Sequence, residues 1–588
     1  MKSLLVYLKN YKKESILAPL FKMLEASFEL LVPLVMAAII DVGIANRDKE
    51  YIIKMCLVLI GLGLIGLTCS VTAQYYSAKA AAGFGVGVRK ALFSHIQKFG
   101  FAEMDECGSA TLVTRMTSDV NQAQSGVNLV LRLFLRSPFI VAGAMIMAFT
   151  VDVKAAVTFA VVIPLLSIVV FGIMLITMPM YKKVQSNLDQ VLLTTRENLT
   201  GARVIRAFNK EKEERKQFEK KNHALTETQK FVGKISGLMN PLTYVIVNGG
   251  IVVLIYVGAL RVNAGSLTQG EVVALLNYMS QILVELIKLA NLIITMTKAV
   301  ACGNRIEAVM NVVPEIHMEL EEEKKTKNQE VDQANENCDV PAVVFSSVSM
   351  KYRGAGAETL TNISFQAKEG QIIGVIGGTG SGKTSLVHLI PRFYDVSSGE
   401  VNVFGKNVKD YSVLELRKLI GVVFQQSVLF KGTIEENLRW GNENASEEEL
   451  QQALEISQAK EFVEEKPGGL QFMIEQSGRN LSGGQKQRLS IARALVKKPK
   501  ILILDDSASA LDYATEAALR SGLARWEENP TLFIVSQRAA SIRHADQILV
   551  LDDGKLVGIG THDQLLKTCP VYQEIYYSQF SEEEPGNE

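Results

Sequence analysis

The chain has 588 residues, more than the ~250–300 that one hydrophobic core usually serves, so we expect two or more domains. Hydrophobic residues make up 48% of it, and its mean hydropathy is +0.16. Its 62 basic and 62 acidic residues cancel, which gives no sign of a nucleic-acid-binding surface. The six cysteines show no CxxC or Cys/His pairing, so they indicate neither a metal site nor a disulfide framework.

Six apolar segments in the first half are each long enough to cross a bilayer, which takes ~20 apolar residues. They lie at about 15–41, 51–78, 129–151, 154–178, 238–260 and 271–296. Residues 155–178 carry no charge, which argues against buried helices of a large soluble core. The start of the chain is charged and lacks the pattern of a cleaved signal peptide. The sequence thus predicts a membrane all-α domain of six helices over residues 1–302.

The basic residues predict how these spans are oriented. Lys and Arg gather at the N-terminus and in the long connection 179–237, whereas the short loops after spans three and five hold only Lys154 and Arg261. Because basic loops stay on the cytoplasmic side, we expect a multi-pass protein of the cell (plasma) membrane with a cytoplasmic N-terminus. In the two long connections, segments 112–120 and 197–218 are predicted to be helices that extend beyond the membrane.

Several charged residues fall inside the predicted spans. Glu25 and Glu29 are four residues apart and share one helix face, and Glu285 and Lys288 are three apart in the sixth span. Charges in a membrane are costly and usually face the bundle interior or water. Three interpretations stay open: Glu25 lies at the inner interface near Lys22, the two glutamates contact a polar or cationic substrate, or they pair with other charges.

A linker and a second domain follow the spans. Residues 303–340 are charged and contain few large apolar residues, which is typical of a surface or partly disordered connection. From residue 341 onward, short apolar strands alternate with helical patterns, as in a three-layer α/β domain. We therefore predict a cytoplasmic α/β P-loop nucleotide-binding domain over residues 341–580.

A glycine-rich loop carries the strongest motif of this domain. The strand 371–376 leads into GGTGSGKT at 377–384, which matches GxxxxGK[ST] between a strand and a helix. The glycines let backbone N–H groups wrap phosphates, Lys383 reaches the β- and γ-phosphates, and the Thr384 hydroxyl is a Mg²⁺ ligand. The predicted nucleotide-binding residues are Gly377, Gly378, Thr379, Gly380, Ser381, Gly382, Lys383, Thr384 and Ser385.

Two further motifs complete the machinery. The strand 501–504 ends at Asp505 and Asp506, and a carboxylate at that position can hold Mg²⁺. A helix begins after Leu481, Ser482, Gly483, Gly484 and Gln485, and the N-terminus of a helix attracts anions. Because the P-loop already serves one nucleotide, a second phosphate-binding element implies a second nucleotide held by a second domain.

With these motifs the chain resembles a half-transporter of the ATP-binding cassette (ABC) exporter family, multidrug type. The resemblance covers about residues 12–575. It implies ATP and Mg²⁺ as cofactors, an adenine-stacking role for Tyr352, a Mg²⁺-sensing role for Gln425 and a D-loop at 509–512 that ends in Asp512. It also implies that segments 112–120 and 197–218 contain or adjoin short coupling helices that dock on nucleotide-binding domains, although Ala110 replaces the usual glycine before the first segment.

The chain departs from the family pattern at two positions of the same site. Asp506 stands where the family has a catalytic Glu, and Gln537 stands where it has a switch His. The shorter Asp506 withdraws its carboxylate from the attacking water, and a displacement of ~1 Å can cost ~10²-fold in rate. Gln537 can still bond a γ-phosphate but cannot carry a positive charge. Together they predict a degenerate site that binds ATP with little turnover.

The expected function is therefore a subunit of an ATP-driven exporter for lipophilic or amphipathic compounds. Its partner would be a second half-transporter chain with an intact site, completed by the signature residues 481–485. Three alternatives remain: a homodimeric exporter with slow turnover, an ATP-gated channel or regulator, and an importer with the same fold. The spans exclude a soluble ATPase, while the substrate beyond the hint from Glu25 and Glu29 stays open.

Overall fold

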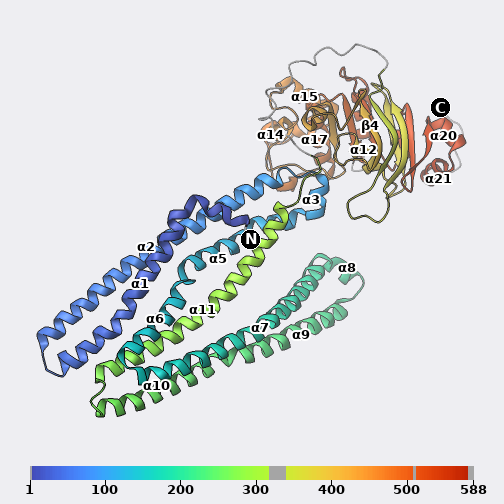
Figure 1. Ribbon diagram of the computed structural model, residues 1–588. Coiled ribbons are helices and arrows are strands. Elements are labelled where there is room, and N and C mark those ends of the chain that lie inside the picture. The colour runs from blue at the N-terminus through green and yellow to red at the C-terminus, as the bar shows by residue number, and fades with distance from the viewer. Residues whose placement is uncertain (1–2, 317–339, 508–510, 581–588) are drawn as a thin grey trace. The chain divides into compact units, whose positions relative to one another are not determined.

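The computed structural model describes residues 3–316, 340–507 and 511–580, so Ser509 and Ala510 of the expected D-loop lie outside the described residues. The chain divides into two compact units, which are described separately (Figure 1). The helical unit comprises Met1–His95 and Ala110–Val312. The sheet unit comprises Ile96–Ser109 and Val313–Glu588, and therefore includes a short excursion from the first half of the chain.

The helical unit confirms the prediction of six spans. Its described residues contain six helical stretches that are long and apolar enough to cross a membrane: Ser3–Ile44, Lys49–Ile96, Ser109–Val151, Val153–Thr200, Glu211–Asn263 and Gln269–Met310. These stretches exceed the predicted spans because the long connections are themselves helical, and Gly201 ends one of them as expected. The last stretch continues to Met310, beyond the expected start of the linker at 303.

The helices of this unit have the following bounds: α1 Lys12–Ala38, α2 Lys49–Ile96, α4 Ser109–Thr114, α5 Val120–Leu133, α6 Arg136–Val151, α7 Val153–Thr200, α8 Ala202–Ala207, α9 Glu211–Gly237, α10 Met239–Asn263 and α11 Gln269–Met310, with the 3₁₀-helix η1 Ser3–Tyr11 and the π-helical turns η2 Ile39–Ile44 and η3 Arg115–Asp119.

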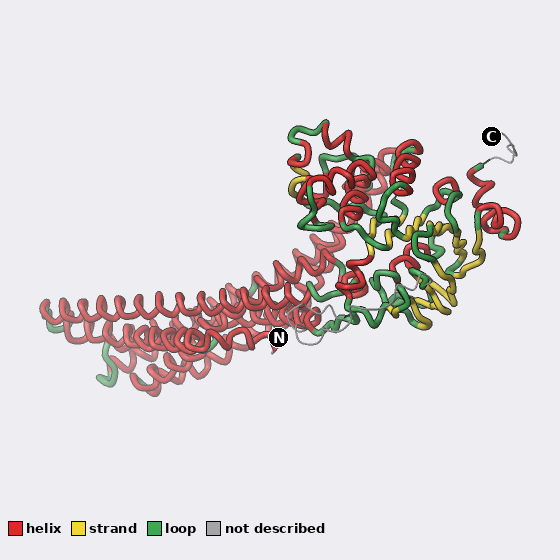
Figure 2. Tube along the Cα trace, turned by 90° about the horizontal axis from the view of Figure 1, so that it is seen from above, coloured by secondary structure: helices red, strands yellow, loops and turns green. Residues whose placement is uncertain are grey.

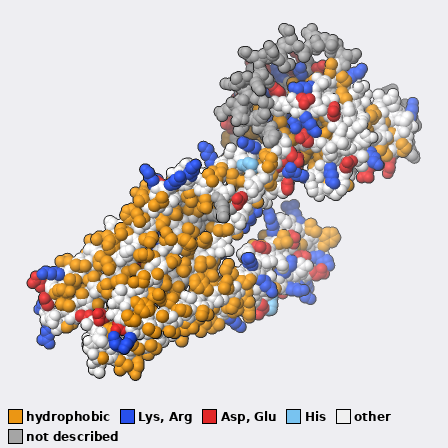
Figure 3. Space-filling view, in the orientation of Figure 1, with side chains coloured by type: hydrophobic (Ala, Val, Ile, Leu, Met, Phe, Trp, Pro, Cys, Tyr) orange, Lys and Arg blue, Asp and Glu red, His pale blue; other side chains and the backbone are white. Residues whose placement is uncertain are grey.

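Apolar side chains cover both the outside and the inside of this unit. Leu57, Leu64 and Ile168 are at least 60% exposed, and Figure 3 shows a broad apolar surface along the helices, as contact with lipid requires. Inside, Tyr278 is fully buried and its hydroxyl donates to the Leu30 carbonyl oxygen at 2.7 Å. A Cβ on Gly126 would lie 2.2 Å from that of Ala299, so small residues allow α5 and α11 to approach closely.

A buried ionic cluster joins three helices of the unit. From α6, Arg136 donates at 2.7 Å both to Glu285 on α11 and to Glu29 on α1. Glu285 also accepts from the Ser137 hydroxyl and from Lys288, both at 2.8 Å. Its side chain is 2% exposed and that of Arg136 is 8% exposed. The cluster therefore links helices far apart in the sequence through a carboxylate and a guanidinium removed from solvent.

The two glutamates considered as substrate contacts are thus both paired. Glu25 accepts from Lys22 at 2.6 Å, and Glu29 is held by Arg136. Sequence reasoning named Glu25, Glu29, Glu285 and Lys288 but missed Arg136, which lies within the third predicted span.

The sheet unit contains three sheets among its described residues. A six-stranded sheet has the order β12-β11-β3-β10-β9-β6, parallel except for β12, and a four-stranded antiparallel sheet has the order β2-β1-β4-β5. Figure 2 shows these strands, and a short β7-β8 pair forms the third sheet. The strands are β1 Val343–Met350, β2 Leu360–Ala367, β3 Ile372–Gly377, β4 Ser398–Val403, β5 Lys406–Asn407, β6 Ile420–Val423, β7 Gly432–Thr433, β8 Met473–Ile474, β9 Ile501–Asp505, β10 Thr531–Val535, β11 Gln547–Asp552 and β12 Lys555–Gly560.

Strand β9 shows how the layers of this unit pack. Its residues Ile501 and Ile503 belong to the core shared with the antiparallel sheet, whereas Leu502 and Leu504 belong to the core on the other face. Because side chains alternate along a strand, β9 is buried on both faces, as its continuous apolar sequence predicts.

The α-helices of the sheet unit are α3 Phe101–Cys107, α12 Lys383–Leu389, α13 Val413–Leu419, α14 Ile434–Arg439, α15 Glu447–Ile456, α16 Lys460–Glu464, α17 Gly483–Val496, α18 Tyr513–Ala524, α19 Ala539–Ile542, α20 His562–Thr568 and α21 Pro570–Gln579.

Helix α3 lies next to the first of the two segments that were expected to contain or adjoin a coupling helix. It ends at Cys107, shortly before segment 112–120, and it belongs to the sheet unit. The Phe101 ring stacks on Phe393 with centroids 4.2 Å apart, and Asp105 accepts from the Tyr394 hydroxyl at 2.6 Å. Segment 112–120 instead packs within the helical unit, where Asp119 accepts from Arg305 Nε at 3.0 Å. Within the sheet unit, α3 is thus held by the ring of Phe101 and the carboxylate of Asp105.

The ionic cluster leads to a stability prediction. Arg136→Met leaves Glu285 buried with one cation fewer, and breaking a buried pair costs up to ~3–5 kcal/mol. We expect a clear drop in the thermal unfolding temperature of the detergent-purified protein. The double variant Arg136→Met/Glu285→Met removes both charges and should recover much of that loss.

An exposed pair supplies the matched control. Lys54 and Glu50 have side chains that are 66% and 80% exposed, so Lys54→Met should change stability by less than ~1 kcal/mol. Two outcomes would contradict the structural importance of the cluster. One is an Arg136→Met protein with the same unfolding temperature as the wild type, and the other is a double variant that unfolds at as low a temperature as the single one.

Candidate functional site

The glycine-rich loop between β3 and α12 forms one wall of a cleft of about 290 Å³. Gly380 and Gly382 have φ values of +83° and +94°, which glycine adopts without strain. A Cβ on Gly377 would lie 2.1 Å from the Leu551 carbonyl oxygen, so no other residue fits there. The loop therefore presents backbone, with little side chain, to whatever enters the cleft.

Lys383 lies folded into this loop. Its Nζ donates to the carbonyl oxygens of Gly377 at 2.9 Å and Gly378 at 2.6 Å, and burial lowers its pKa. The hydroxyl of Ser381 is buried and has no hydrogen-bond partner among the described residues. A buried ammonium bonded only to carbonyls and an unsatisfied hydroxyl are groups that phosphate oxygens would satisfy, so the loop fits a nucleotide.

The two acids at the end of β9 lie opposite the loop. Thr384 Oγ1 donates to Asp505 Oδ1 at 3.0 Å, which brings together the hydroxyl and carboxylate oxygens that Mg²⁺ prefers. Burial raises the pKa of Asp505, and the neighbouring Asp506 raises it further. A bound Mg²⁺ would neutralise this charge and withdraw electron density from the phosphates. The residues present therefore fit the ion, with Thr384 and Asp505 as ligands and Gln425 beside them.

Asp506 has a distinct backbone and a distinct partner. Its φ of +47° lies in the left-handed region, which Asp tolerates better than most residues with a side chain. Gln425 Nε2 donates to its carboxylate at 3.2 Å. Burial raises the pKa of Asp506, whereas the bond from Gln425 lowers it. Gln537 lines the same cleft, so the two departures from the family pattern face one cavity.

The structure brings most of the predicted site residues together. Thr379, Gly380, Gly382, Lys383, Thr384, Ser385, Gln425, Asp505, Asp506 and Gln537 all line the cleft. It adds Thr359 and Val535, which carry no recognisable motif. Tyr352 lies beside the cleft, where its hydroxyl is 2.8 Å from the Ser385 hydroxyl, and burial raises its pKa.

The signature residues and Asp512 do not line this cleft. Ser482 caps α17 by accepting from the Gln485 N–H at 3.3 Å, and the Gln485 side chain bonds the Ser482 N–H at 3.1 Å. Ser482 and Gly483 are exposed. Asp512 caps α18 by accepting from the Thr515 N–H at 2.8 Å. One chain thus holds a phosphate loop in a cleft and a second helix N-terminus open on its surface.

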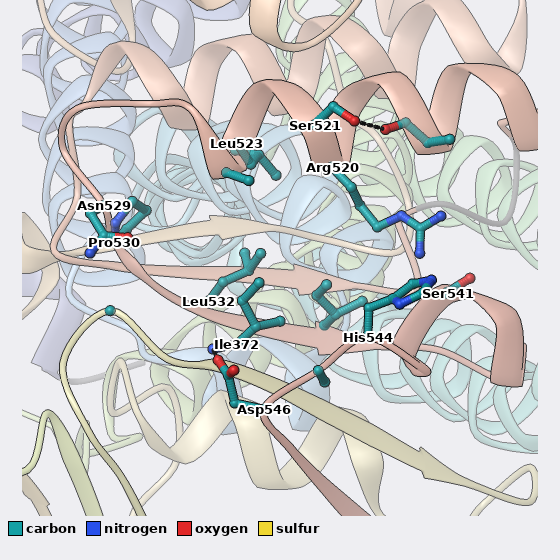
Figure 4. Close-up of a pocket in the computed structure, with 15 residues that line it drawn as sticks. Ile372, Arg520, Ser521, Leu523, Asn529, Pro530, Leu532, Ser541, His544 and Asp546 are labelled. Atoms are coloured by element: carbon teal, nitrogen blue, oxygen red, sulfur yellow. Dashed lines mark hydrogen bonds between the residues drawn. The ribbon is translucent and has the colours of Figure 1, made fainter. Parts of the chain in front are cut away.

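A second cavity, of about 500 Å³, lies at the opposite ends of strands β3 and β10 (Figure 4). Arg520 and Ser521 of α18 line it together with His544 and the strand residues Ile372 and Leu532. It has neither a glycine-rich loop nor an acid pair. The chemistry therefore points to the smaller cleft as the nucleotide site.

An ABC-type ATPase is defined by a P-loop, an acidic residue for Mg²⁺ at the end of a strand, and an LSGGQ segment at the start of a helix. In this chain these features are joined to six membrane spans, as in an exporter half-transporter. The comparisons agree, and the chain belongs to the ABC transporter family. Residues 15–286 match the model of the ABC transporter transmembrane region, and residues 360–509 match the ABC transporter model. It is a multi-pass membrane protein with a cytoplasmic nucleotide-binding domain, an ATP-driven translocase by class.

The relatives extend over nearly the whole chain. The uncharacterized ABC transporter ATP-binding protein YfiB of Bacillus subtilis is 36% identical over 583 residues, 99% of each chain. The ATP-dependent lipid A-core flippase of Vibrio vulnificus is 26% identical over 99% of this chain and 98% of its own. A solved bacterial Atm1-family ABC exporter with ATP bound has the same fold, with a TM-score of 0.76 at 21% identity over 97% of this chain and 99% of its own.

The buried carboxylate leads to a prediction about stability and ligand binding. Asp505→Asn keeps a hydrogen-bond acceptor for Thr384 but removes the buried charge. Without nucleotide, we expect the variant to melt about 2–4 °C higher than the wild type for each 1 kcal/mol of desolvation cost that the substitution removes. Addition of MgATP should no longer raise its melting temperature. Because the folded-state pKa of Asp505 is raised, its charge costs stability above that pKa, so the gain should shrink as pH falls through the raised pKa toward the ordinary value of an Asp side chain.

Asp552, exposed at the end of β11, supplies the control. Asp552→Asn should leave both the melting temperature and its response to MgATP unchanged. A destabilised Asp505→Asn protein, or one still stabilised by MgATP as the wild type is, would contradict this account of the site.

Proposed function

We propose that this chain is one subunit of a heterodimeric ABC exporter and that its own nucleotide site retains ATP with little turnover. Its signature residues Leu481–Gln485 complete a competent site on a different half-transporter chain. The observation that carries the proposal is the pair Asp506 and Gln537, which face one cleft beside an otherwise intact set of nucleotide-binding residues.

The contacts of Asp506 support weak turnover. The carboxylate is one methylene shorter than that of Glu and lies within reach of Gln425 at 3.2 Å. A base drawn back by ~1 Å from the attacking water can lose ~10²-fold in rate. Binding depends on other groups, namely the glycine loop, Lys383 and Thr384, and these keep the contacts that a nucleotide site needs.

Two exposed surfaces support a second chain. Ser482 and Gly483 present the α17 N-terminus to solvent, away from the cleft of their own chain, so a phosphate bound there must come from another domain. At the tip of the α7–α9 hairpin, Leu199, Val204 and Phe208 are 74%, 60% and 71% exposed (Figure 1). Apolar side chains grouped at the tip of a cytoplasmic hairpin fit a docking contact on a nucleotide-binding domain.

The cargo that fits best is lipophilic or amphipathic. The Vibrio relative is named as a lipid A-core flippase, which supports a substrate of that class. Glu25 and Glu29, considered earlier for cationic drugs, are each neutralised by a cation of the same unit. Glu29, paired with Arg136, keeps 40% side-chain exposure, and Lys288, paired with Glu285, keeps 43%, so each paired group has an exposed side that a polar headgroup can contact.

The residues of the chain then act as follows. The glycine loop and Lys383 bind the β- and γ-phosphates. Thr384 and Asp505 would hold Mg²⁺, which would neutralise phosphate charge. Gln537 donates to the γ-phosphate without transferring a proton, and Asp506 orients water poorly. The retained nucleotide holds the two domains together, while hydrolysis in the partner's site separates them and the coupling helices pass the motion to the spans.

The decisive test is the ATPase activity of this chain with and without its partner. Purified alone and reconstituted in lipid, the chain should hydrolyse ATP far more slowly than ~1 s⁻¹, and co-assembly with the partner half-transporter should raise turnover at least tenfold. Robust turnover by the chain alone would instead favour the homodimeric exporter. ATP-dependent uphill uptake of a lipophilic probe into inverted vesicles should accompany the assembled activity, and passive flux alone would favour a channel.

Restoring the two residues tests the degenerate site directly. In the assembled transporter with the partner's catalytic Glu changed to Gln, Asp506→Glu/Gln537→His should raise the residual ATPase at least ~10-fold, because both missing groups return to the cleft. The control Gln537→His alone should change the residual ATPase little, because Asp506 is still one methylene shorter than Glu. Unchanged activity in the double variant would show that other groups limit this site.

A further inference from the structure

The C-terminal helix α21 contacts the backbone of the segment that carries Gln537. The side-chain amide of Gln579, the last residue of α21, makes two hydrogen bonds to it. Its Nε2 donates to the Gln537 carbonyl oxygen at 2.7 Å, and its Oε1 accepts from the Ala539 N–H at 2.9 Å. One planar group thus bridges the backbone on both sides of Arg538.

These two bonds satisfy backbone groups that would otherwise face solvent or remain unpaired. Ala539 begins the short helix α19, whose first N–H groups have no partner within the helix. Arg538, the N-cap residue, makes no side-chain cap hydrogen bond. Gln579 therefore supplies the cap from another helix and at the same time fixes the carbonyl of Gln537, which limits the directions in which the Gln537 side chain can point.

Helix α21 is itself anchored independently of this contact. Tyr572 is fully buried and its hydroxyl lies 2.8 Å from His562 Nδ1. Gln573 Nε2 donates to the Leu566 carbonyl oxygen at 2.7 Å. Because these contacts hold the helix against α20, it offers Gln579 a fixed base. Gln579 is exposed, so its loss removes two hydrogen bonds without opening a cavity in the core.

Other contacts hold the same segment from different sides. Ser536 Oγ accepts from the Arg538 N–H at 2.9 Å, and Arg520 of α18 donates to the Ala540 carbonyl oxygen at 3.3 Å. Neither reaches the Gln537 carbonyl. Gln579 alone among these three side chains bonds to Gln537 itself, so it is the contact best placed to set the geometry of that residue toward the cleft.

We propose that Gln579 is a positioning residue of the nucleotide site, which holds the backbone of Gln537 so that its amide faces the terminal phosphate. The C-terminal helix is then part of the machinery that distinguishes ATP from ADP. The proposal rests on the assignment of the cleft as a nucleotide site.

The first experiment needs no nucleotide. In the assembled transporter, hydrogen–deuterium exchange of peptides that cover residues 536–543 should be faster in Gln579→Ala than in the wild type. Gln573→Ala is the matched control: it removes the same amide from the same helix, but its partner is Leu566. It should leave exchange at 536–543 unchanged.

The second experiment measures the preference for ATP over ADP. Photolabelling of this chain with 8-azido-ATP, competed by ATP and by ADP, gives the ratio of the two affinities. Gln579→Ala should lower that ratio about threefold to tenfold, with ADP affinity unchanged. This is less than full loss of a hydrogen bond to a charged phosphate would cost, because the Gln537 amide is still present but no longer held in place. Gln579→Glu can still accept from Ala539 but cannot donate to Gln537, and should give a smaller loss.

The double variant decides whether Gln579 acts through Gln537. If it does, Gln537→Ala/Gln579→Ala should show no larger loss of ATP preference than Gln537→Ala alone. An unchanged ratio in Gln579→Ala, an additive double variant, or a Gln573→Ala that matches Gln579→Ala would overturn the proposal. A different result would count against the nucleotide site itself. If 8-azido-ATP labels neither the wild type nor any variant, while exchange at 536–543 responds as expected, the assignment of the cleft as a nucleotide site is wrong and only the backbone contact is supported.

Discussion

The carboxylate of Asp505, buried at the end of a strand that is itself buried on both faces, is the constraint on which the sheet unit depends. Strand β9 must be apolar on both sides to fit between the two cores, so the first acid can occur only where the strand ends. There it meets Thr384 from the start of α12. Burying this charge without a cation costs stability, and a bound Mg²⁺ would offset that cost.

Binding and turnover use different groups of the same cleft, and this separation makes a degenerate site physically reasonable. In the proposed site, backbone N–H groups and Lys383 would hold the phosphates, and neither the glycine loop nor Lys383 is hydrogen-bonded to Asp506. Turnover depends on the position of one carboxylate, where a change of one methylene matters. Selection can therefore remove catalysis from one of two sites while keeping nucleotide as a structural element between the two domains.

Motifs in which backbone geometry requires particular residues were predictable from the sequence. The P-loop, the strand-end acids and the six spans were all found, because glycine conformations, strand burial and bilayer thickness leave few alternatives. Contacts between distant segments were not. Arg136 pairs with Glu29 and Glu285 across three helices, Gln579 bonds a segment forty residues away, and the Phe101 ring of α3 stacks on Phe393. No local periodicity encodes such pairs.

The capping box of the signature helix bears on how long two domains stay together. Ser482 and Gln485 already satisfy each other's backbone N–H groups, and such a cap is worth about 1 kcal/mol. A phosphate arriving from another chain must compete with that cap, so part of its attraction is offset by the bonds it replaces. When the phosphate leaves, the helix end recaps itself within its own chain. In the proposed dimer, this local bond re-forms when the domains separate, so it would favour separation and keep the closed state reversible.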